Sequence, residues 1–253
     1  MSDNPFEGTL HPTPPAKKGS WTSFLVKLVL GTVGILFVVA LLLPAQRRVR
    51  PATRRAGCIN NVRQMGLAIL NYESATGSLP PAYTVDEDGN RLHSWRTLIL
   101  PYIEEGGLYD SIDLTKPWDD PVNAEARKAV ITPYLCPSAH HDETKTTYLA
   151  VVGHNTAFTG SEKRSWAEAT KELGASATLA IVDVPDDLAV HWMSPYDTDI
   201  DTLDRLTVDS ETNHDGIIIG CFLDNHTQSL SLENLGKFLD AVRKGEMQNF
   251  DEY

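Results

Sequence analysis

Two clusters of histidine and carboxylate residues have side chains of the types that bind metal ions. The first is the run His140–Glu143 (HHDE), and the second comprises His214, Asp215, Asp224 and His226. Zinc sites place such ligands at set spacings on a defined scaffold. Neither cluster has that spacing, so a polar loop and a turn are the favoured interpretations. We expect no metal ion and, without a Gly-rich phosphate loop or a flavin or nicotinamide motif, no other cofactor.

Hydrolytic chemistry has little support in the sequence. A hydrolase needs a nucleophile, a base that activates it and a group that stabilises the oxyanion. No serine lies in a nucleophile-elbow pattern such as G-x-S-x-G. His191 falls in an apolar run and is expected to be packed, whereas His226 lies at a predicted hairpin tip and is expected to be solvated. The sequence therefore predicts no catalytic site and no enzyme activity.

Three tryptophans, Trp95, Trp118 and Trp192, are candidate ligand-contact aromatics. Their indole rings could form a stacking platform for sugars, but tryptophans more often anchor a core or a packed loop. An exposed cleft lined by these rings would favour a binding module. Burial of all three would favour a structural protein.

The chain has three cysteines, Cys58, Cys136 and Cys221. None belongs to a CxxC pair, so neither a zinc knuckle nor a thioredoxin-like site has support. Cys221 lies in an apolar run (IIIGCFL) and is expected to be a small buried hydrophobe.

The elements that would hold these residues form an α+β domain. Apolar residues at three- and four-residue steps from Thr53 predict an amphipathic helix that ends at Gly77. A short helix ended by Gly106-Gly107 is predicted next. Strands joined by hairpins, together with a closing amphipathic helix, imply an antiparallel sheet with helix packed on one side. The predicted strands are Thr146–Val152, Ala177–Val184, Leu188–Met193, Ile217–Leu223 and Thr227–Leu232, with a turn at Asp224–His226 and the closing helix from Leu232.

The longest apolar run extends from Trp21 to Leu43 and contains one charge, Lys27. About 20 apolar residues in a helix cover the roughly 30 Å hydrocarbon core of a bilayer, so a transmembrane helix is predicted here. A buried core helix and a cleaved secretory signal are the alternatives, but the run exceeds the roughly 7–15 residues of a usual signal core. A flexible polar tail (residues 1–20) is predicted before the span, and a soluble domain (residues 44–253) after it.

The net charge of −12 is unevenly distributed along the chain. The segment 44–63 holds several arginines and no acid, whereas acids outnumber bases from Gln64 onward. An acidic domain that lacks a basic patch with interleaved aromatics repels nucleic acid. We therefore expect no nucleic-acid partner.

Several short motifs follow one another between Pro44 and Glu246. They include Arg55–Gln64 (RAGCINNVRQ), Ser94–Arg96 (SWR), Lys116–Asp119 (KPWD), Tyr134–Ser138 (YLCPS), His214–Gly216 (HDG) and Cys221–Asp224 (CFLD). In content and order these motifs resemble the bacterial domain-of-unknown-function 1559 family (DUF1559). That family resembles type IV pilins and type II secretion pseudopilins, which carry a prepilin-like start, a long helix and a β-rich head outside the inner membrane.

The resemblance implies a long N-terminal transmembrane helix that continues into an amphipathic helix packed on an antiparallel β-sheet head. For a domain outside the cytoplasm it also implies a disulfide between Cys58 and Cys136. The family has no established biochemical role. We expect a single-pass, pseudopilin-like structural or interaction protein of the cell envelope, with the lipid bilayer and other envelope proteins as partners. A membrane-tethered module that binds a solute, peptide or glycan is the alternative.

The start of the chain departs from the pilin pattern, and the charges around the helix conflict with the expected orientation. Lys17-Lys18-Gly19 fits the processing motif, but the fifth residue after Gly19 is Phe24, where pilins have a glutamate that pairs with a neighbour's N-terminus inside lipid. This difference argues against ordered filament assembly. The positive-inside rule places the domain in the cytoplasm, whereas the resemblance places it in the periplasm. We adopt the periplasmic orientation because pilin-like proteins commonly keep basic residues on the outer part of the helix.

Overall fold

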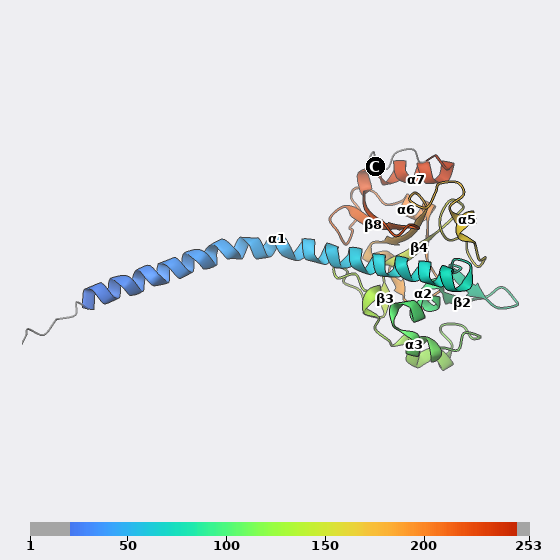
Figure 1. Ribbon diagram of the computed structural model, residues 1–253, viewed down its shortest axis with the longest axis horizontal. Coiled ribbons are helices and arrows are strands. Elements are labelled where there is room, and N and C mark those ends of the chain that lie inside the picture. The colour runs from blue at the N-terminus through green and yellow to red at the C-terminus, as the bar shows by residue number, and fades with distance from the viewer. Residues whose placement is uncertain (1–20, 247–253) are drawn as a thin grey trace, which may run out of the picture. The chain divides into compact units, whose positions relative to one another are not determined.

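The computed structural model describes residues 21–246, although the side chains of residues 22, 37 and 39–50 lie outside the described set (Figure 1). The polar tail predicted for residues 1–20 also lies outside the described residues. The chain divides into two compact units, Met1–Val49 and Arg50–Tyr253. The α-helices are α1 (Trp21–Thr76), α2 (Trp95–Leu98), α3 (Gly106–Asp110), α4 (Ala124–Arg127), α5 (Trp166–Ala169), α6 (Ile200–Leu203) and α7 (Leu232–Lys244). The strands are β1 (Tyr83–Val85), β2 (Arg91–Ser94), β3 (Lys145–Thr146), β4 (Tyr148–Val152), β5 (Leu179–Asp183), β6 (Val190–His191), β7 (Thr198–Asp199), β8 (Ile217–Phe222) and β9 (Thr227–Ser231). Short 3₁₀ helices are η1 (Leu100–Ile103), η2 (Pro121–Asn123), η3 (Thr132–Tyr134) and η4 (Asp186–Leu188).

In the first unit, the described residues belong to the start of α1. Large apolar side chains on this part of the helix are exposed, among them Trp21, Phe24 and Leu36. The predicted span from Trp21 to Leu43 lies on this helix, and the side chains of residues 39–43 are outside the described set. Within the described part of the chain, no helix combines the length and the apolar character needed to cross a membrane.

The second unit is built around a five-stranded sheet with the order β7-β4-β5-β8-β9. The pairs β4–β5, β5–β8 and β8–β9 are antiparallel, as predicted, but β7 runs parallel to β4. The sheet is therefore mixed, and the prediction of an antiparallel sheet is wrong at this edge. With only two residues, Thr198 and Asp199, β7 is too short to show the alternation that identifies a strand in a sequence.

Side chains that alternate along the strands divide between two cores, one on each face of the sheet. On β4, Tyr148 and Ala150 belong to the core that contains α1, whereas Leu149 and Val151 belong to the core that contains α7. Helices thus cover both faces (Figure 1), where the sequence predicted helix on one side only. The central strand β5 is buried along its whole length, so each of its faces needs a cover. The α1 residues in the first core are Cys58, Val62, Met65, Ala68 and Ile69, and the α7 residues in the second are Leu232, Leu235, Phe238, Leu239 and Val242.

The ends of the two large helices follow from local sequence. Helix α1 ends at Thr76, where Gly77 takes a left-handed φ of 78°. The Ser231 hydroxyl caps α7 by accepting a backbone N–H of the first turn, and Gly245 ends the helix with a φ of 70°. In the β8–β9 hairpin, Asn225 has a φ of 67°, which asparagine tolerates. The predicted amphipathic helix, closing helix and hairpin are confirmed.

Two other predicted elements differ from the structure. The helix predicted to end at Gly106-Gly107 ends earlier, because Glu104 adopts a left-handed φ of 68° after η1, and Gly106 instead begins α3. The predicted strand Leu188–Met193 contains only the two-residue β6, which pairs with β3 outside the main sheet. A turn follows at once, because Ser194 N–H donates to the His191 carbonyl.

Gly66 lies where α1 passes close to the β8–β9 hairpin. A Cβ atom there would clash with Asn225 Oδ1 and would lie 2.9 Å from Cys221 Sγ. We expect Gly66→Ala to lower the free energy of unfolding by about 1–3 kcal/mol through overpacking, although alanine favours helix over glycine by about 1 kcal/mol. Urea unfolding of the full chain in detergent, followed by tryptophan fluorescence, measures this loss.

The matched control is Gly236→Ala in α7. Its added Cβ would meet Asp204 Oδ1 at 3.6 Å, an ordinary contact, so we expect a gain of about 0.5–1 kcal/mol from helix propensity alone. If both substitutions raised stability equally, the close approach of α1 to the hairpin would be contradicted.

Candidate functional site

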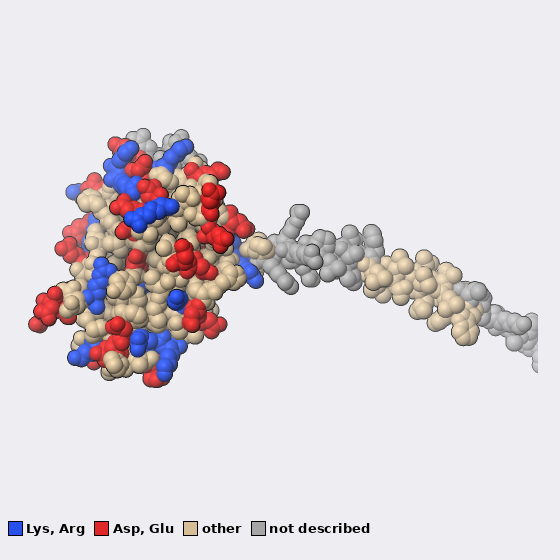
Figure 2. All heavy atoms as spheres, turned by 180° about the vertical axis from the view of Figure 1, so that it is seen from behind, with Lys and Arg blue, Asp and Glu red and all other residues tan. Residues whose placement is uncertain are grey.

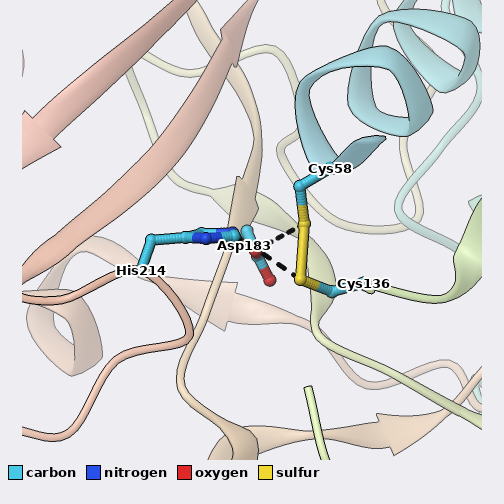
Figure 3. Close-up of side chains that lie close together, drawn as sticks. All are labelled: Cys58, Cys136, Asp183 and His214. Atoms are coloured by element: carbon cyan, nitrogen blue, oxygen red, sulfur yellow. Dashed lines mark hydrogen bonds and ion pairs between the residues drawn. A yellow bond between two sulfur atoms is a disulfide. The ribbon is translucent and has the colours of Figure 1, made fainter. Parts of the chain in front are cut away.

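Four buried side chains from separate segments meet at the end of β5 (Figure 3). Cys58 is on α1, Cys136 follows η3, Asp183 is the last residue of β5, and His214 precedes β8. None of the four is more than 5% exposed. Because β5 and β8 are antiparallel, the end of the first and the start of the second lie at the same edge of the sheet. Cys58 faces that edge from the buried stripe of α1.

A disulfide joins Cys58 to Cys136, whose Cα atoms are 5.3 Å apart. Beside it, His214 Nε2 donates to Asp183 Oδ2 at 3.0 Å and lies 3.6 Å from Cys136 Sγ. The same carboxylate oxygen lies 3.2 Å from Cys58 Sγ. One imidazole nitrogen and one carboxylate oxygen are therefore turned toward the two sulfur atoms (Figure 3).

Neighbouring polar groups hold this cluster in place. Asp183 Oδ1 accepts hydrogen bonds from Thr147 Oγ1 at 2.5 Å and from Asn213 Nδ2 at 3.2 Å. The Tyr148 hydroxyl donates to Cys58 Sγ at 2.9 Å, because a disulfide sulfur has no proton. Burial raises the pKa of Tyr148 well above its usual value, and the nearby Asp183 adds to the rise, so the phenol stays neutral. Such outer hydrogen bonds are those that orient metal ligands.

The four side chains offer sulfur, imidazole and carboxylate, which are ligands that zinc accepts. Their ligand atoms all lie within 4.8 Å of one another, and no other group of this kind occurs among residues 21–246. Sequence reasoning missed this group, because it placed His214 with its sequence neighbours and left Asp183 inside a predicted strand. The usable signal is that Asp183 ends the apolar strand β5, while His214 precedes the apolar strand β8.

A comparison with models of protein families identifies the family of this chain. Residues 47–193 match the model of a family described as a protein of unknown function, DUF1559. The chain belongs to the DUF1559 family. A search of the curated proteins and of the solved structures finds no match. Of the four clustered residues in this DUF1559 chain, Cys58, Cys136 and Asp183 lie within the matched range and His214 lies beyond it. The family resemblance is confirmed, and its pilin-like part stays a prediction.

The three candidate tryptophans of the DUF1559 chain do not share a surface. Trp95 and Trp192 are buried, and their indole N–H groups donate to Asp197 Oδ1 at 3.1 Å and to a backbone carbonyl at 3.0 Å. Trp118 is half-buried and packs against the first core. Trp95 and Trp192 therefore offer no face to a ligand here, because each ring fills the core and each N–H already has an acceptor.

The structure separates the members of both predicted polar clusters. The run His140–Glu143 is a loop, as predicted, in which the Asp142 carboxylate accepts the backbone N–H of Thr144 at 2.8 Å. In the second cluster His214 turns inward, whereas Asp224 accepts a hydrogen bond from His226 Nδ1 at 2.5 Å on the β8–β9 turn. The His226 ring also stacks on Phe222, with ring centroids 4.5 Å apart, but its side chain is 38% exposed, so it is solvated on one side, as predicted.

Arg96, from the SWR motif, forms a second buried ionic group. Its side chain is fully buried and pairs with Asp197 at 2.6 Å. Burial raises the pKa of Asp197, while the guanidinium opposes that rise. The remaining guanidinium N–H groups donate to the backbone carbonyls of Tyr148, Trp192, Ser194 and Tyr196. The group joins α2, β4 and the segment 192–197 without solvent access, which is an arrangement for holding structure.

Cys221, the third cysteine, is buried on β8 and is a free thiol. Burial raises the pKa of this thiol to about 12, and the nearby Asp224 adds to the effect. A thiol that remains protonated is a poor nucleophile, so the predicted role as a small buried hydrophobe is confirmed.

Proposed function

We propose that the chain is a membrane-anchored, pseudopilin-like structural or interaction protein of the bacterial cell envelope, without catalytic activity. The observation that carries the proposal is the surface of α1 in the first unit, where large apolar side chains between Trp21 and Val38 are 45–77% exposed. Exposed apolar surface costs roughly 25 cal/mol per Å² in water, so lipid is its favoured environment. In the sequence the apolar run continues to Leu43, with Lys27 as its only charge.

The later part of α1 supports the pilin-like side of the proposal. Between Cys58 and Ile69 the helix contributes a buried stripe to the core beneath the sheet. A long helix that is apolar at its start and amphipathic where it meets a β-rich head is the organisation that pilins and pseudopilins have. With Phe24 in place of the pilin glutamate, no buried carboxylate is available to pair with a neighbouring subunit. We therefore propose an anchor rather than a filament subunit.

The proposed location is the inner membrane, with the second unit in the periplasm. The disulfide between Cys58 and Cys136 supports this orientation, because disulfides persist in oxidising compartments such as the periplasm and are rare in the cytosol. The arginines that follow the apolar run argue for the opposite orientation. Labelling from outside the inner membrane distinguishes the two orientations.

The alternative, a tethered binding module, has weaker support. A surface hollow of about 250 Å³ lies between β4, α6 and the end of α7, which is below the roughly 300–1,000 Å³ of most ligand pockets. Its arginine, Arg243, is already paired with the carboxylates of Asp201, Asp204 and Asp240. Because these carboxylates neutralise Arg243, the hollow gives little support to a binding module. A structural or interaction role is therefore favoured.

The charge distribution supports the proposed partners. Figure 2 shows carboxylate and basic side chains interspersed over the visible face of the second unit, in a chain whose net charge is −12. Such a face is well solvated and has no basic stripe for a phosphate backbone. The proposed partners are the lipid bilayer and other envelope proteins, and nucleic acid is not among them.

Membrane fractionation tests the anchor. We expect the full chain to remain in the membrane pellet after a carbonate wash, and the double variant Val29→Arg/Val33→Arg to move to the supernatant. Each arginine at the centre of a membrane helix costs about 2.5–3.5 kcal/mol. The matched control is Leu67→Arg, because Leu67 is a 50% exposed apolar residue of α1 in the second unit, and it should leave the chain in the pellet.

Orientation is measured in the same cells with Val208→Cys in a Cys221→Ala background, since Val208 is 62% exposed. An impermeant maleimide should label this cysteine in spheroplasts without lysis. Recovery of the unmodified chain in the carbonate supernatant would contradict the anchor, and labelling only after lysis would contradict the periplasmic orientation.

A further inference from the structure

The cluster of Cys58, Cys136, Asp183 and His214 plays no part in membrane anchoring, yet its side chains are those of a metal site. We propose that, once the disulfide is reduced, this cluster binds one zinc ion through two thiolates, one imidazole and one carboxylate. The disulfide and the zinc complex are then alternative states of one site.

The distances between the four side chains are close to those of a tetrahedral zinc complex. With zinc bonds of about 2.0 Å to nitrogen or oxygen and about 2.3 Å to sulfur, the ligand atoms are separated by about 3.3 Å (N to O) and about 3.5 Å (S to N or O). The observed separations are 3.0 Å from His214 Nε2 to Asp183 Oδ2, 3.6 Å from Nε2 to Cys136 Sγ, and 3.2 Å from Oδ2 to Cys58 Sγ. The largest change needed is between the two sulfur atoms, which must separate from bonding distance to about 3.8 Å. Reduction is therefore the step that opens the site.

The same contacts fit a metal centre better than a catalytic triad. In a triad the carboxylate binds one imidazole nitrogen and the nucleophile binds the other. Here Asp183 and Cys136 both face the same atom, His214 Nε2 (Figure 3). All four side chains are also buried, so no substrate reaches them, whereas a small ion needs only brief local opening. Two thiolates favour zinc over the hard cations calcium and magnesium.

The surroundings are suited to the charge of such a complex. Two thiolates, one carboxylate and Zn²⁺ carry a net charge of about −1, which needs hydrogen-bond donors in a buried site. Thr147 Oγ1 and Asn213 Nδ2 already donate to the free carboxylate oxygen of Asp183, and the Tyr148 hydroxyl donates to Cys58 Sγ. These donors stay in place when Oδ2 and the sulfur bind the metal.

The two states are linked by a balanced reaction. A dithiol reductant, such as a periplasmic thiol–disulfide oxidoreductase, gives two electrons and two protons to the Cys58–Cys136 bond and itself becomes a disulfide. The two thiols then lose their protons as zinc binds, because the thiolate is the ligand form. The His214 proton moves from Nε2 to Nδ1, which leaves Nε2 free to bind the metal. Reoxidation by a disulfide oxidant reverses both steps and releases the ion.

Cobalt binding to the full chain in detergent tests the proposal. The chain is prepared as the disulfide and, after treatment with a phosphine reductant that is then removed, as the dithiol. We expect the reduced chain to bind one equivalent of Co²⁺ with thiolate-to-cobalt charge-transfer bands and tetrahedral d–d bands, both abolished by added Zn²⁺. The disulfide form should show neither. Cys221→Ala should behave like the unmodified chain, since Cys221 lies outside the cluster.

Variants then assign the ligands. His214→Ala and Asp183→Asn should each weaken Co²⁺ binding by at least about 10-fold, and Asp224→Asn, on the β8–β9 turn, should not. Zinc should also protect Cys58 and Cys136 of the reduced, unmodified chain from iodoacetamide, a readout that does not depend on any variant folding. A reduced, folded chain without thiolate–cobalt bands or zinc protection would overturn the proposal. So would His214 and Asp183 variants that bind Co²⁺ as tightly as the unmodified chain.

Discussion

Replacing Arg96 with alanine should lower the free energy of unfolding by about 3–5 kcal/mol, because it leaves the buried Asp197 carboxylate without its cation. The guanidinium has no exposed surface, and Asp197 is only 3% exposed. Asp197 Oδ1 also accepts the Trp95 indole N–H and the Ala150 backbone N–H. These neutral donors remain in the variant, but they cannot replace a full positive charge in a site that water does not reach.

Arg96 contributes more than one ion pair. All five of its guanidinium N–H groups have acceptors, and four of those acceptors are backbone carbonyls (Trp192, Tyr148, Ser194 and Tyr196). A buried ion pair can often be replaced by apolar residues at little cost. Here the carbonyls would lose their donors, and each unsatisfied buried group costs about 1–3 kcal/mol. The double variant Arg96→Met/Asp197→Leu should therefore remain destabilised, and Arg96→Lys should recover only part of the loss, since lysine has no planar fork.

Urea unfolding of the full chain in detergent, followed by near-UV circular dichroism, measures these losses. The control is Arg91→Ala, because Arg91 is an exposed arginine on the neighbouring strand whose guanidinium lies 4.0 Å from the centre of the Tyr83 ring. Its removal should cost less than about 1 kcal/mol. Full stability of the Arg96→Met/Asp197→Leu variant would show that the carbonyl bonds matter little and that the interpretation of Arg96 as a structural hub is wrong.

The parts of the fold that the sequence predicts are those set by local periodicity. The stripe of Val62, Met65 and Ile69 repeats every three or four residues, so it identifies the packed part of α1 whatever the remaining chain does. The same holds for α7 and for the β8–β9 hairpin, whose turn is marked by Asn225. Strand β7 could not be found this way. It consists of two residues, and it pairs with β4 directly after Asp197, whose buried ion-pair partner Arg96 is far away in sequence.

The candidate site, in contrast, could not be predicted from local sequence patterns. Its residues are spread from Cys58 to His214, and no local pattern links them. The pairing of Cys58 with Cys136 could be expected from the family resemblance, but not the approach of Asp183 and His214 to that pair. Two polar residues at strand ends are common in any sheet, and only the antiparallel pairing of β5 with β8 brings these two together. The choice between buried and exposed tryptophans stayed open in the sequence for a related reason, because burial depends on partners far away in sequence.

Removing the disulfide should have the second large effect on stability. We expect the double variant Cys58→Ser/Cys136→Ser to lose about 2–4 kcal/mol of unfolding free energy, because the bond closes a long loop, with a sequence separation of 78 residues, and so restricts the unfolded chain. Cys221→Ser is the matched control, since it changes a buried cysteine that closes no loop. Urea midpoints of the full chain in detergent, with and without a phosphine reductant, provide the measurement.

Added zinc distinguishes the stability lost with the crosslink from the stability lost with the metal site. Reduction of the unmodified chain should destabilise it about as much as the double serine variant, since both lack the covalent bond. Added zinc should then restore about 2.7 kcal/mol to the reduced chain at a free concentration 100 times the dissociation constant, and nothing to the serine variant, which has no thiolates. If the reduced chain kept its full stability without zinc, the disulfide would not be holding α1 to the segment after η3. If zinc stabilised both proteins equally, the ion would be binding elsewhere, and the stabilisation would not come from Cys58 and Cys136.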